Sequence, residues 1–392
     1  MTKTFLRLFI FIPLLSSCVS QRAINGNDLH FTKHVLTTDF ISEGVAVADV
    51  NKDGRMDVMA GAYWFEAPGW TKHELAPGKT YDGAKEYSNS FLNFAMDVNH
   101  DGWTDLIWID FPGKPAHWYE NPRNQPGHWK KHMIGDSVSV GNESPAFVDI
   151  DKDGIRDLLC ADSKTKQMVW MRAPAKNEPL VWQRYPISKV NAPGTNIFSH
   201  GLGWGDINKD GREDVMIKEG WWEAPADPKQ PEWTFHPAAL GEDCSQMHVL
   251  DVNSDGKNDV VSSAAHRLGI WWHEQPAAGS SWKTHLISDT VTQTHATRLS
   301  DLNNDGHPDF LTGKRFYAHL ATNNDPGSFA PPILIWFEFT PGKAPFWIPH
   351  VVDNNSGVGL NIVTEDVTRD KRIDIVIANK KGVFVFENNS SR

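Results

Sequence analysis

The chain has 392 residues, and its 49 acidic and 38 basic side chains give a formal net charge of −11 at pH 7. No basic stripe with interleaved aromatic residues runs along it, which argues against a nucleic-acid partner. It also contains no G-x-S-x-G nucleophile motif, no phosphate-binding glycine loop and no dinucleotide fingerprint.

The first residues have the pattern of a bacterial lipoprotein signal. Lys3 and Arg7 precede an apolar run from Leu8 to Leu15, and small residues then lead to Cys18. The run is too short for a membrane span. We expect residues 1–18 to be the signal, Cys18 to carry the lipid and residues 19–29 to form a tether. The protein would then sit in the bacterial cell envelope, at the outer membrane, held to the membrane by the lipid alone. An ordinary cleaved signal with an incidental cysteine is the alternative.

A nine-residue acidic loop recurs seven times, beginning at Asp49 (DVNKDGRMD), and Asp stands at positions 1, 5 and 9 of every copy. Oxygen ligands on alternate residues of a tight turn can converge on one hard cation, and the Gly at position 6 permits the turn. We therefore predict several bound Ca²⁺ ions; Asp/Asn-rich turns without an ion are the alternative. The seventh copy has Thr368 and Lys371 at positions 3 and 6, and we expect it to be empty. The predicted ligands of the other six loops are Asp49, Asn51, Asp53 and Asp57; Asp97, Asn99, Asp101 and Asp105; Asp149, Asp151, Asp153 and Asp157; Asp206, Asn208, Asp210 and Asp214; Asp251, Asn253, Asp255 and Asp259; and Asp301, Asn303, Asp305 and Asp309.

Each loop lies between two short apolar runs, and an aromatic strand such as YWFEAP at Tyr63 follows. A fourth element has an aromatic residue and usually a His three positions on, as in Trp70-Thr-Lys-His73. Four strands per unit, at spacings of 45 to 65 residues, predict an all-β fold, a seven-bladed β-propeller of four-stranded blades spanning residues 30–392.

The last unit lacks its fourth strand, and Phe31-Thr-Lys-His34 supplies the missing pattern. The N-terminal strand, residues 30 to 36, should therefore complete the last blade. The regularly recurring fourth-strand histidines should be architectural.

Strand order predicts one candidate site. Residues that enter the inner strands share a face with the loops between second and third strands, opposite the acidic loops. The first group contains Glu43, Glu143, His200, His248 and His295; the second contains Lys218, Glu219, His266, Arg267, Lys314, Arg315, Tyr317 and His319. The five histidines of these groups do not follow the repeat. They could hold a transition metal such as zinc or act as a proton-transfer set, or they could be ordinary loop residues.

The basic residues of the same groups suit a carboxylated sugar or a developing enolate. Glu43 and Glu143 could alternatively be a glycosidase pair. The insertion at residues 317–332 could be a lid or a plain surface loop.

The repeats resemble FG-GAP/VCBS-type repeats, the Ca²⁺-binding blades also found in integrin α-chain propellers. The tryptophan-rich form here, with W-x-E-x-P after four of the seven loops, is also similar to the propeller part of fungal aldos-2-ulose dehydratase, which eliminates water from keto-sugars. The resemblance implies a carbohydrate partner, and two functions follow. The first is a lyase or dehydratase acting on a keto-sugar or uronate. The second is a non-catalytic, calcium-stabilised module that binds a glycan or a protein.

Overall fold

The structure is a computed structural model that describes residues 29–135, 138–277, 281–321 and 325–390. The expected signal, Cys18 and all but the last residue of the expected tether lie outside this range. Strands, turns and bends make up the regular structure of the described part, so the all-β prediction is confirmed. Among those residues, we find no helix with the length and apolar character needed to cross a membrane.

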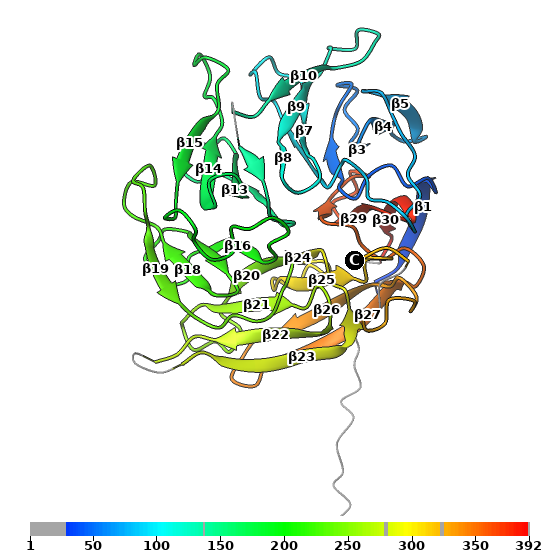
Figure 1. Ribbon diagram of the computed structural model, residues 1–392. Coiled ribbons are helices and arrows are strands. Elements are labelled where there is room, and N and C mark those ends of the chain that lie inside the picture. The colour runs from blue at the N-terminus through cyan, green and yellow to red at the C-terminus, as the bar shows by residue number, and fades with distance from the viewer. Residues whose placement is uncertain (1–28, 136–137, 278–280, 322–324, 391–392) are drawn as a thin grey trace, which may run out of the picture.

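The strands form six hydrogen-bonded sheets arranged around a common centre (Figure 1). Two four-stranded sheets come first in the chain. One contains β2 (Ala46–Ala48), β3 (Asp57–Ala60), β4 (Tyr63–Glu66) and β5 (Thr71–Glu74). The other contains β6 (Leu92–Met96), β7 (Asp105–Ile109), β9 (His117–Glu120) and β10 (Lys130–Met133).

The next two sheets are larger. The six-stranded sheet contains β8 (Lys114–Pro115), β11 (Ser139–Val140), β12 (Ala146–Val148), β13 (Asp157–Asp162), β14 (Gln167–Arg172) and β15 (Gln183–Pro186). The eight-stranded sheet contains β16 (Leu202–Gly205), β17 (Asp214–Ile217), β18 (Gly220–Glu223), β19 (Thr234–Pro237), β20 (Gln246–Leu250), β21 (Asp259–Ser263), β22 (Leu268–Glu274) and β23 (Lys283–Thr292).

Two further four-stranded sheets complete the arrangement. They contain β24 (Thr297–Ser300), β25 (Asp309–Gly313), β26 (Leu334–Thr340) and β27 (Phe346–Asp353), and then β28 (Ile362–Glu365), β29 (Asp374–Asn379), β30 (Gly382–Asn388) and β1 (Phe31–Thr37). Neighbouring sheets contact one another through some of these strands: β2 lies beside both β6 and β28, and β24 lies beside both β20 and β28. The fold is an all-β propeller.

The expectation of seven separate four-stranded blades is wrong, because the described strands form six sheets. The eight-stranded sheet arises where β16 and β20 pair in parallel, with Leu202 opposite Gln246 and Gly203 opposite Met247. The sequence permits this approach because β16 carries glycines. A Cβ atom on Gly203 would lie 2.7 Å from the Met247 carbonyl oxygen, and one on Gly205 would lie 2.7 Å from Val249.

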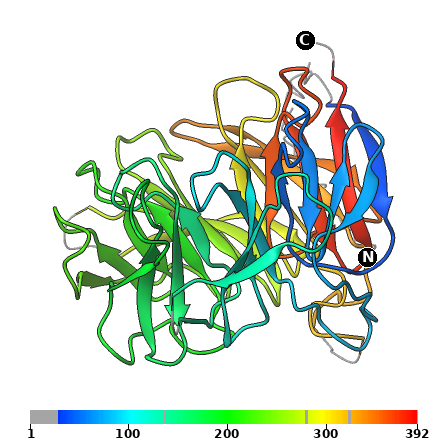
Figure 2. The same cartoon turned by 90° about the horizontal axis from the view of Figure 1, so that it is seen from above.

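The prediction that the N-terminal strand completes the last sheet is confirmed. Strand β1 pairs antiparallel with β30, from Phe31 opposite Asn388 to Thr37 opposite Val383. Figure 2 shows this strand, in blue, lying against the red C-terminal strand. Lys33 adds a 2.9 Å ion pair to Asp353 at the end of β27. Closure removes the open edges of a linear array.

The recurring histidines have the architectural role that their spacing predicted. His73 stacks on Trp64 with ring centroids 4.2 Å apart, and its Nε2 lies 2.8 Å from Glu66. The same arrangement of tryptophan, histidine and glutamate recurs at His132, His236, His285 and His350. Each pair fixes a fourth strand against a third strand. Cys160 and Cys244 are buried and free.

Candidate functional site: a histidine cluster

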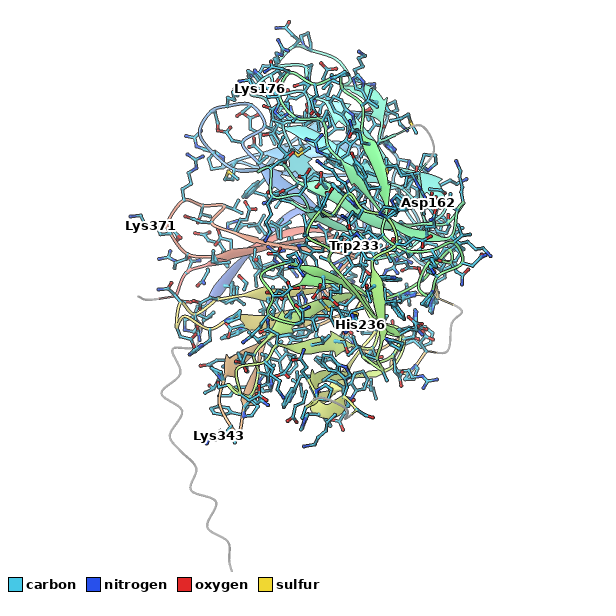
Figure 3. All side chains as sticks on the ribbon, turned by 90° about the vertical axis from the view of Figure 1, so that its left-hand side faces the viewer. Asp162, Lys176, Trp233, His236, Lys343 and Lys371 are labelled. Carbon is cyan, nitrogen blue, oxygen red and sulfur yellow. The ribbon has the colours of Figure 1, made fainter. Side chains whose placement is uncertain are left out.

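Strand order brings most of the predicted site residues to one face. Glu43, Glu143, His200 and His295 lie just before β2, β12, β16 and β24, while His266 joins β21 to β22 and Arg315 follows β25. Figure 3 shows the two faces in profile: Asp162, at the end of β13, lies on the opposite side of the molecule from Lys371 of the seventh acidic loop. The acidic loops join first strands to second strands, whereas the cluster residues precede first strands or follow second strands. The cluster therefore lies at the opposite ends of the strands from the acidic loops, as predicted.

Three imidazoles form the centre of the cluster. The Nε2 atoms of His200 and His266 are 3.1 Å apart, and the rings of His266 and His295 have centroids 5.0 Å apart. One nitrogen from each of the three residues fits within a group whose members all lie within 4.8 Å of one another. Two of the remaining nitrogens have main-chain partners: His200 Nδ1 lies 2.8 Å from the Phe198 carbonyl oxygen, and His295 Nδ1 lies 3.2 Å from that of Gln293.

Burial controls the protonation of this centre. Desolvation, reinforced by the neighbouring His200 and His319, lowers the pKa of His266 to about 3. Desolvation together with Arg315 lowers the pKa of His295 well below its usual range. Both imidazoles are therefore neutral at neutral pH, and each keeps a nitrogen lone pair.

A fourth histidine forms a more accessible pair with a carboxylate. His319, in the insertion, stacks on His266 with a 4.3 Å centroid distance, and its Nδ1 lies 2.6 Å from Asp325 Oδ2. The His319 side chain is 36% exposed, and the Asp325 side chain is 18% exposed. A carboxylate bound to Nδ1 fixes the tautomer that carries its lone pair on Nε2.

Arg315 lies beneath the histidines in a buried ion-pair network. Its guanidinium contacts Glu43 directly and lies 3.5 Å from Glu143 Oε2, and its side chain is only 2% exposed. Burial alone would lower the pKa of Arg315, but the two carboxylates more than offset this and raise it. Tyr87 packs its ring 5.5 Å from the guanidinium. Because both glutamates pair with Arg315, the glycosidase alternative gains no support.

Other predicted site residues have partners outside the three central imidazoles. His248 lies within β20, where its Nε2 is 2.9 Å from Thr297 Oγ1. Lys218 pairs with Asp243 at 3.0 Å and with Glu219 at 3.3 Å, and the exposed Arg267 lies 3.6 Å from Glu242.

Lys314 is also used elsewhere, since its buried ammonium donates to the carbonyl oxygens of Ser328 and Ala330 and so holds the insertion. The basic residues predicted to add positive charge to this face are therefore paired with acids or carbonyls.

The described part of the insertion is docked rather than free. The Ala321 amide donates to the Ala84 carbonyl at 3.0 Å, and the Tyr87 hydroxyl donates to the Ala318 carbonyl at 2.9 Å. Lys380 donates to the Tyr317 carbonyl at 2.8 Å. The described part of the insertion is thus held in place beside His319, which argues against a plain surface loop.

Sequence reasoning missed Asp325, Tyr87 and Lys380, which lie in stretches outside the repeat. The position of Asp325 six residues after His319, in the same insertion, was the one available signal for the pair.

The acidic loops share one geometry. In the first, Asp49 Oδ2 accepts from the Gly54 amide at 3.0 Å, and Asn51 Oδ1 accepts from the Asp53 amide at 3.0 Å. Asp57 is buried and accepts from the Val50 and Ala67 amides, which anchors the loop to the sheet.

The candidate metal ligands of such a loop are all hard oxygen atoms. Two of these atoms, Asp49 Oδ1 and Asp151 Oδ1, are buried without hydrogen-bond partners. The residues therefore fit a Ca²⁺ ion. In the third loop, Arg172 already pairs with Asp151 at 2.9 Å and with Asp153 at 3.0 Å.

The seventh loop keeps the turn but lacks the oxygen ligand that Asn or Asp provides at position 3 of the other loops. Lys371 adopts a φ of 69° where the other loops have Gly, and its amide donates to Asp366 Oδ2 at 2.8 Å. The Thr368 hydroxyl donates to Asp374 Oδ2 at 3.2 Å in place of a ligating amide oxygen.

Comparison with known proteins supports the repeat assignment. The FG-GAP-like repeat family matches residues 97–160, 149–217 and 251–312. Each segment starts at the first Asp of one acidic loop and extends through the next loop. The chain therefore contains FG-GAP-like repeats. Integrin alpha-PS5 of Drosophila melanogaster is 24% identical over 185 residues, an alignment that covers 39% of this chain and 17% of the integrin. The chain thus matches less than a fifth of that relative's length.

The solved structures with similar folds have low sequence identities and low TM-scores. A lectin of Agrocybe aegerita that recognises non-reducing terminal N-acetylglucosamine is 16% identical, with a TM-score of 0.47 over 88% of this chain and 87% of the lectin. The exotype rhamnogalacturonan lyase YesX is 12% identical, with a TM-score of 0.45 over 92% and 73% of the two chains. The V. cholerae biofilm matrix protein Bap1 is 11% identical, with a TM-score of 0.40 over 93% and 84%.

Proposed function

We propose that this protein is a carbohydrate-active lyase or dehydratase that eliminates water or a glycosidic group from a keto-sugar or uronate. The observation that carries the proposal is the His319–Asp325 pair, held at 2.6 Å beside three largely buried imidazoles. A half-exposed imidazole oriented by a carboxylate is the usual form of a general base.

The elimination can be assigned to this pair. His319 Nε2 takes the proton from the carbon beside a carbonyl or carboxylate, and Asp325 stabilises the imidazolium that forms. The electrons of the broken C–H bond form the new C=C bond as the C–O bond to the leaving group breaks. The imidazolium then returns its proton to the departing oxygen, so the products are an unsaturated sugar and water or an alcohol.

The carbohydrate class rests on two observations. The tryptophan-rich repeat is similar to the propeller part of aldos-2-ulose dehydratase. In addition, Phe198, two residues before His200, is 45% exposed, and Phe329 on the insertion is 67% exposed. Exposed aromatic faces near the cluster can accept the apolar face of a sugar ring.

Two further proposals concern the setting of this site. The acidic loops bind Ca²⁺ and stiffen the propeller, as their oxygen donors suggest. Residues 1–18 direct the protein to the bacterial cell envelope, where lipidated Cys18 anchors it at the outer membrane. Metal analysis before and after chelation tests the first proposal, and mass spectrometry of the N-terminal peptide from the membrane fraction tests the second.

A panel of uronate polymers and keto-sugars, followed by ultraviolet absorption of the unsaturated product, tests the function. His319→Ala should lower kcat/KM by about 100-fold or more, which is the usual contribution of a general base. His128→Ala is the matched control, since His128 is exposed and pairs with Glu74 away from the cluster. Its activity should equal that of the wild type.

The alternative is a glycan-binding or protein-binding module. The internal pairing of Lys218, Arg315 and Glu143 favours it, because these charges are satisfied without a substrate. Glycan binding by the wild type, with no product formed from any bound glycan, would establish this alternative.

A further inference from the structure

We propose that a crevice between the first and last sheets binds a uronic acid residue of an acidic glycan. This seam crevice is lined by His34, Arg55, Trp70, Arg369 and Glu387, among others, and has a volume of about 420 Å³. Ligand pockets in proteins occupy roughly 300–1,000 Å³. The two arginines come from the first and seventh acidic loops, so the seam crevice lies at the acidic-loop ends of the strands, away from the histidine cluster. The inference concerns binding alone and does not rest on the proposed reaction.

The two arginines keep most of their donors for a ligand. Arg55, at position 7 of the first loop, contacts Asp53 Oδ2 at 3.1 Å, and its side chain is 57% exposed. Arg369, at position 4 of the seventh loop, reaches the first loop, where its Nη1 lies 3.6 Å from the position that a Cβ atom on Gly54 would take. Within the described part of the chain, Arg369 forms no ion pair. A guanidinium offers five N–H donors in a fork that matches the two oxygens of a carboxylate.

The same two loop positions are used differently at the seam between the third and fourth loops. There the side chain at position 4, Lys152, pairs with Glu213 at 3.1 Å. The side chain at position 7, Arg212, donates from Nε to the Ala224 carbonyl oxygen at 2.7 Å. These contacts hold the two loops together, and the crevice beside them is only about 130 Å³. Neither contact occurs among the described residues of the seam crevice, so its cations remain available to a ligand.

A partly uncovered tryptophan forms another part of the wall. Five fourth-strand histidines stack on a third-strand tryptophan, but His34 lies opposite Val385 and has no such ring beneath it. Its ring is instead tilted by 56° against that of Trp70, with centroids 6.4 Å apart. Trp70 is half-buried, whereas the corresponding tryptophans of the next three units are 7%, 4% and 5% exposed: Trp129, Trp182 and Trp233. The uncovered part of the Trp70 ring can pack against the apolar face of a sugar ring.

Glu387 favours a uronate over a phosphate. Its Oε2 lies 2.7 Å from His34 Nε2, and carboxylate oxygens accept hydrogen bonds from sugar hydroxyls. The same negative charge disfavours a doubly charged phosphate, whereas a uronate brings one negative charge and several hydroxyl groups. The crevice between the first and second sheets has a similar volume, about 440 Å³, but Glu66 and Glu74 line it without a lysine or an arginine. An acidic glycan should therefore select the seam crevice.

Isothermal titration calorimetry at a fixed Ca²⁺ concentration tests the proposal. The probes are trimers of galacturonic, glucuronic and mannuronic acid, each compared with its methyl ester, which keeps the rings and removes the charge. We expect the wild type to bind at least one acid trimer, and to bind it more weakly as salt is raised. Its methyl ester should bind at least about 10-fold more weakly. Arg55→Gln and Arg369→Gln should each weaken binding of the acid trimer roughly 10-fold or more. Arg212→Gln is the matched control, because Arg212 has the same loop position as Arg55 but donates to the Ala224 carbonyl; it should bind as the wild type does.

A substitution that fills the crevice gives a second, independent variant. Asn121 follows the third strand of the second sheet, and its Nδ2 donates to the Val50 carbonyl oxygen of the preceding loop at 3.0 Å. Ala67 holds the same place in the first sheet, since both backbone amides donate to the last aspartate of their own loop. Val367 corresponds to Val50 and lines the seam crevice. Ala67→Asn should bridge to the Val367 carbonyl, occupy part of the crevice and weaken trimer binding without lowering the melting temperature.

Each outcome decides the proposal. No binding of any acid trimer by the wild type overturns it, and this result needs no variant to fold. Unchanged affinity in both arginine variants also overturns it, as does tighter binding of inorganic phosphate or of anionic phospholipid vesicles than of every trimer. Trimer binding that the arginine variants lose, without turnover of any substrate, would refute the proposed reaction and leave the seam crevice standing. Turnover together with a trimer affinity that these variants do not change would do the reverse.

Discussion

The buried network around Arg315 makes a strong prediction about stability. Glu43→Gln removes the carboxylate that contacts the guanidinium, and the side chains of Arg315 and Glu43 are 2% and 1% exposed. Breaking a buried ion pair by removing one partner costs roughly 3–5 kcal/mol, because the remaining charge stays buried and uncompensated. Glu143 remains 3.5 Å from the guanidinium, so we expect a value near the lower end, about 3 kcal/mol.

Urea unfolding at a fixed Ca²⁺ concentration measures this loss. Glu66→Gln is the matched control, because Glu66 also pairs with a basic side chain, that of His73, but is itself 36% exposed. Exposed pairs contribute about 0–1 kcal/mol, so the control should remain close to the wild type. A loss below about 1 kcal/mol for Glu43→Gln, equal to the control, would refute the buried-network reasoning.

Three further predictions concern calcium, closure and pH. Chelation should lower the melting temperature, and Asp210→Ala should lower it far more than Asp370→Ala, because the seventh loop has lost its amide ligand and its glycine; equal effects would contradict the assignment of calcium loops. Deletion of residues 29–37 should expose the edge of β30 and lower the melting temperature of the whole domain, and an unchanged value would contradict the closure. Burial lowers the pKa of Lys380 from 10.5 to about 8, so the folded chain loses this proton before the unfolded chain does. Wild-type stability should therefore rise relative to Lys380→Met as pH increases from 8 to 10.5, with a total change of about 3 kcal/mol. A difference in unfolding free energy that stays constant over this range would contradict the buried charge.

Local patterns predicted much of this architecture because each unit repeats the same contacts. The pairing of tryptophan and histidine on adjacent strands follows from their fixed positions, as at Trp64 and His73. The merging of two units into one sheet was not predictable from the repeat. It depends on Gly203 and Gly205, whose lack of side chains matters only once β20 lies beside them.

Strand order predicted the site in part. His200 and His295 each precede an inner strand by two residues, whereas His248 is the third residue of β20. That difference in register places His248 beside Thr297 rather than in the cluster. The pairing of the basic residues was not predictable for another reason. Arg315 and Glu43 are 272 residues apart, and nothing local to either one shows that they pair.

The central claim is that His319 removes a proton from a carbon beside a carbonyl or carboxylate, and deuterium uptake tests it most directly. Wild-type protein would be incubated in D₂O with a bound keto-sugar or uronate analogue that lacks a leaving group, and NMR would follow the hydrogen on that carbon. The account predicts exchange of this hydrogen by the wild type and by His128→Ala, and its loss in His319→Ala. Exchange at the wild-type rate in His319→Ala, or no exchange by wild-type protein on analogues that it binds, would contradict the account.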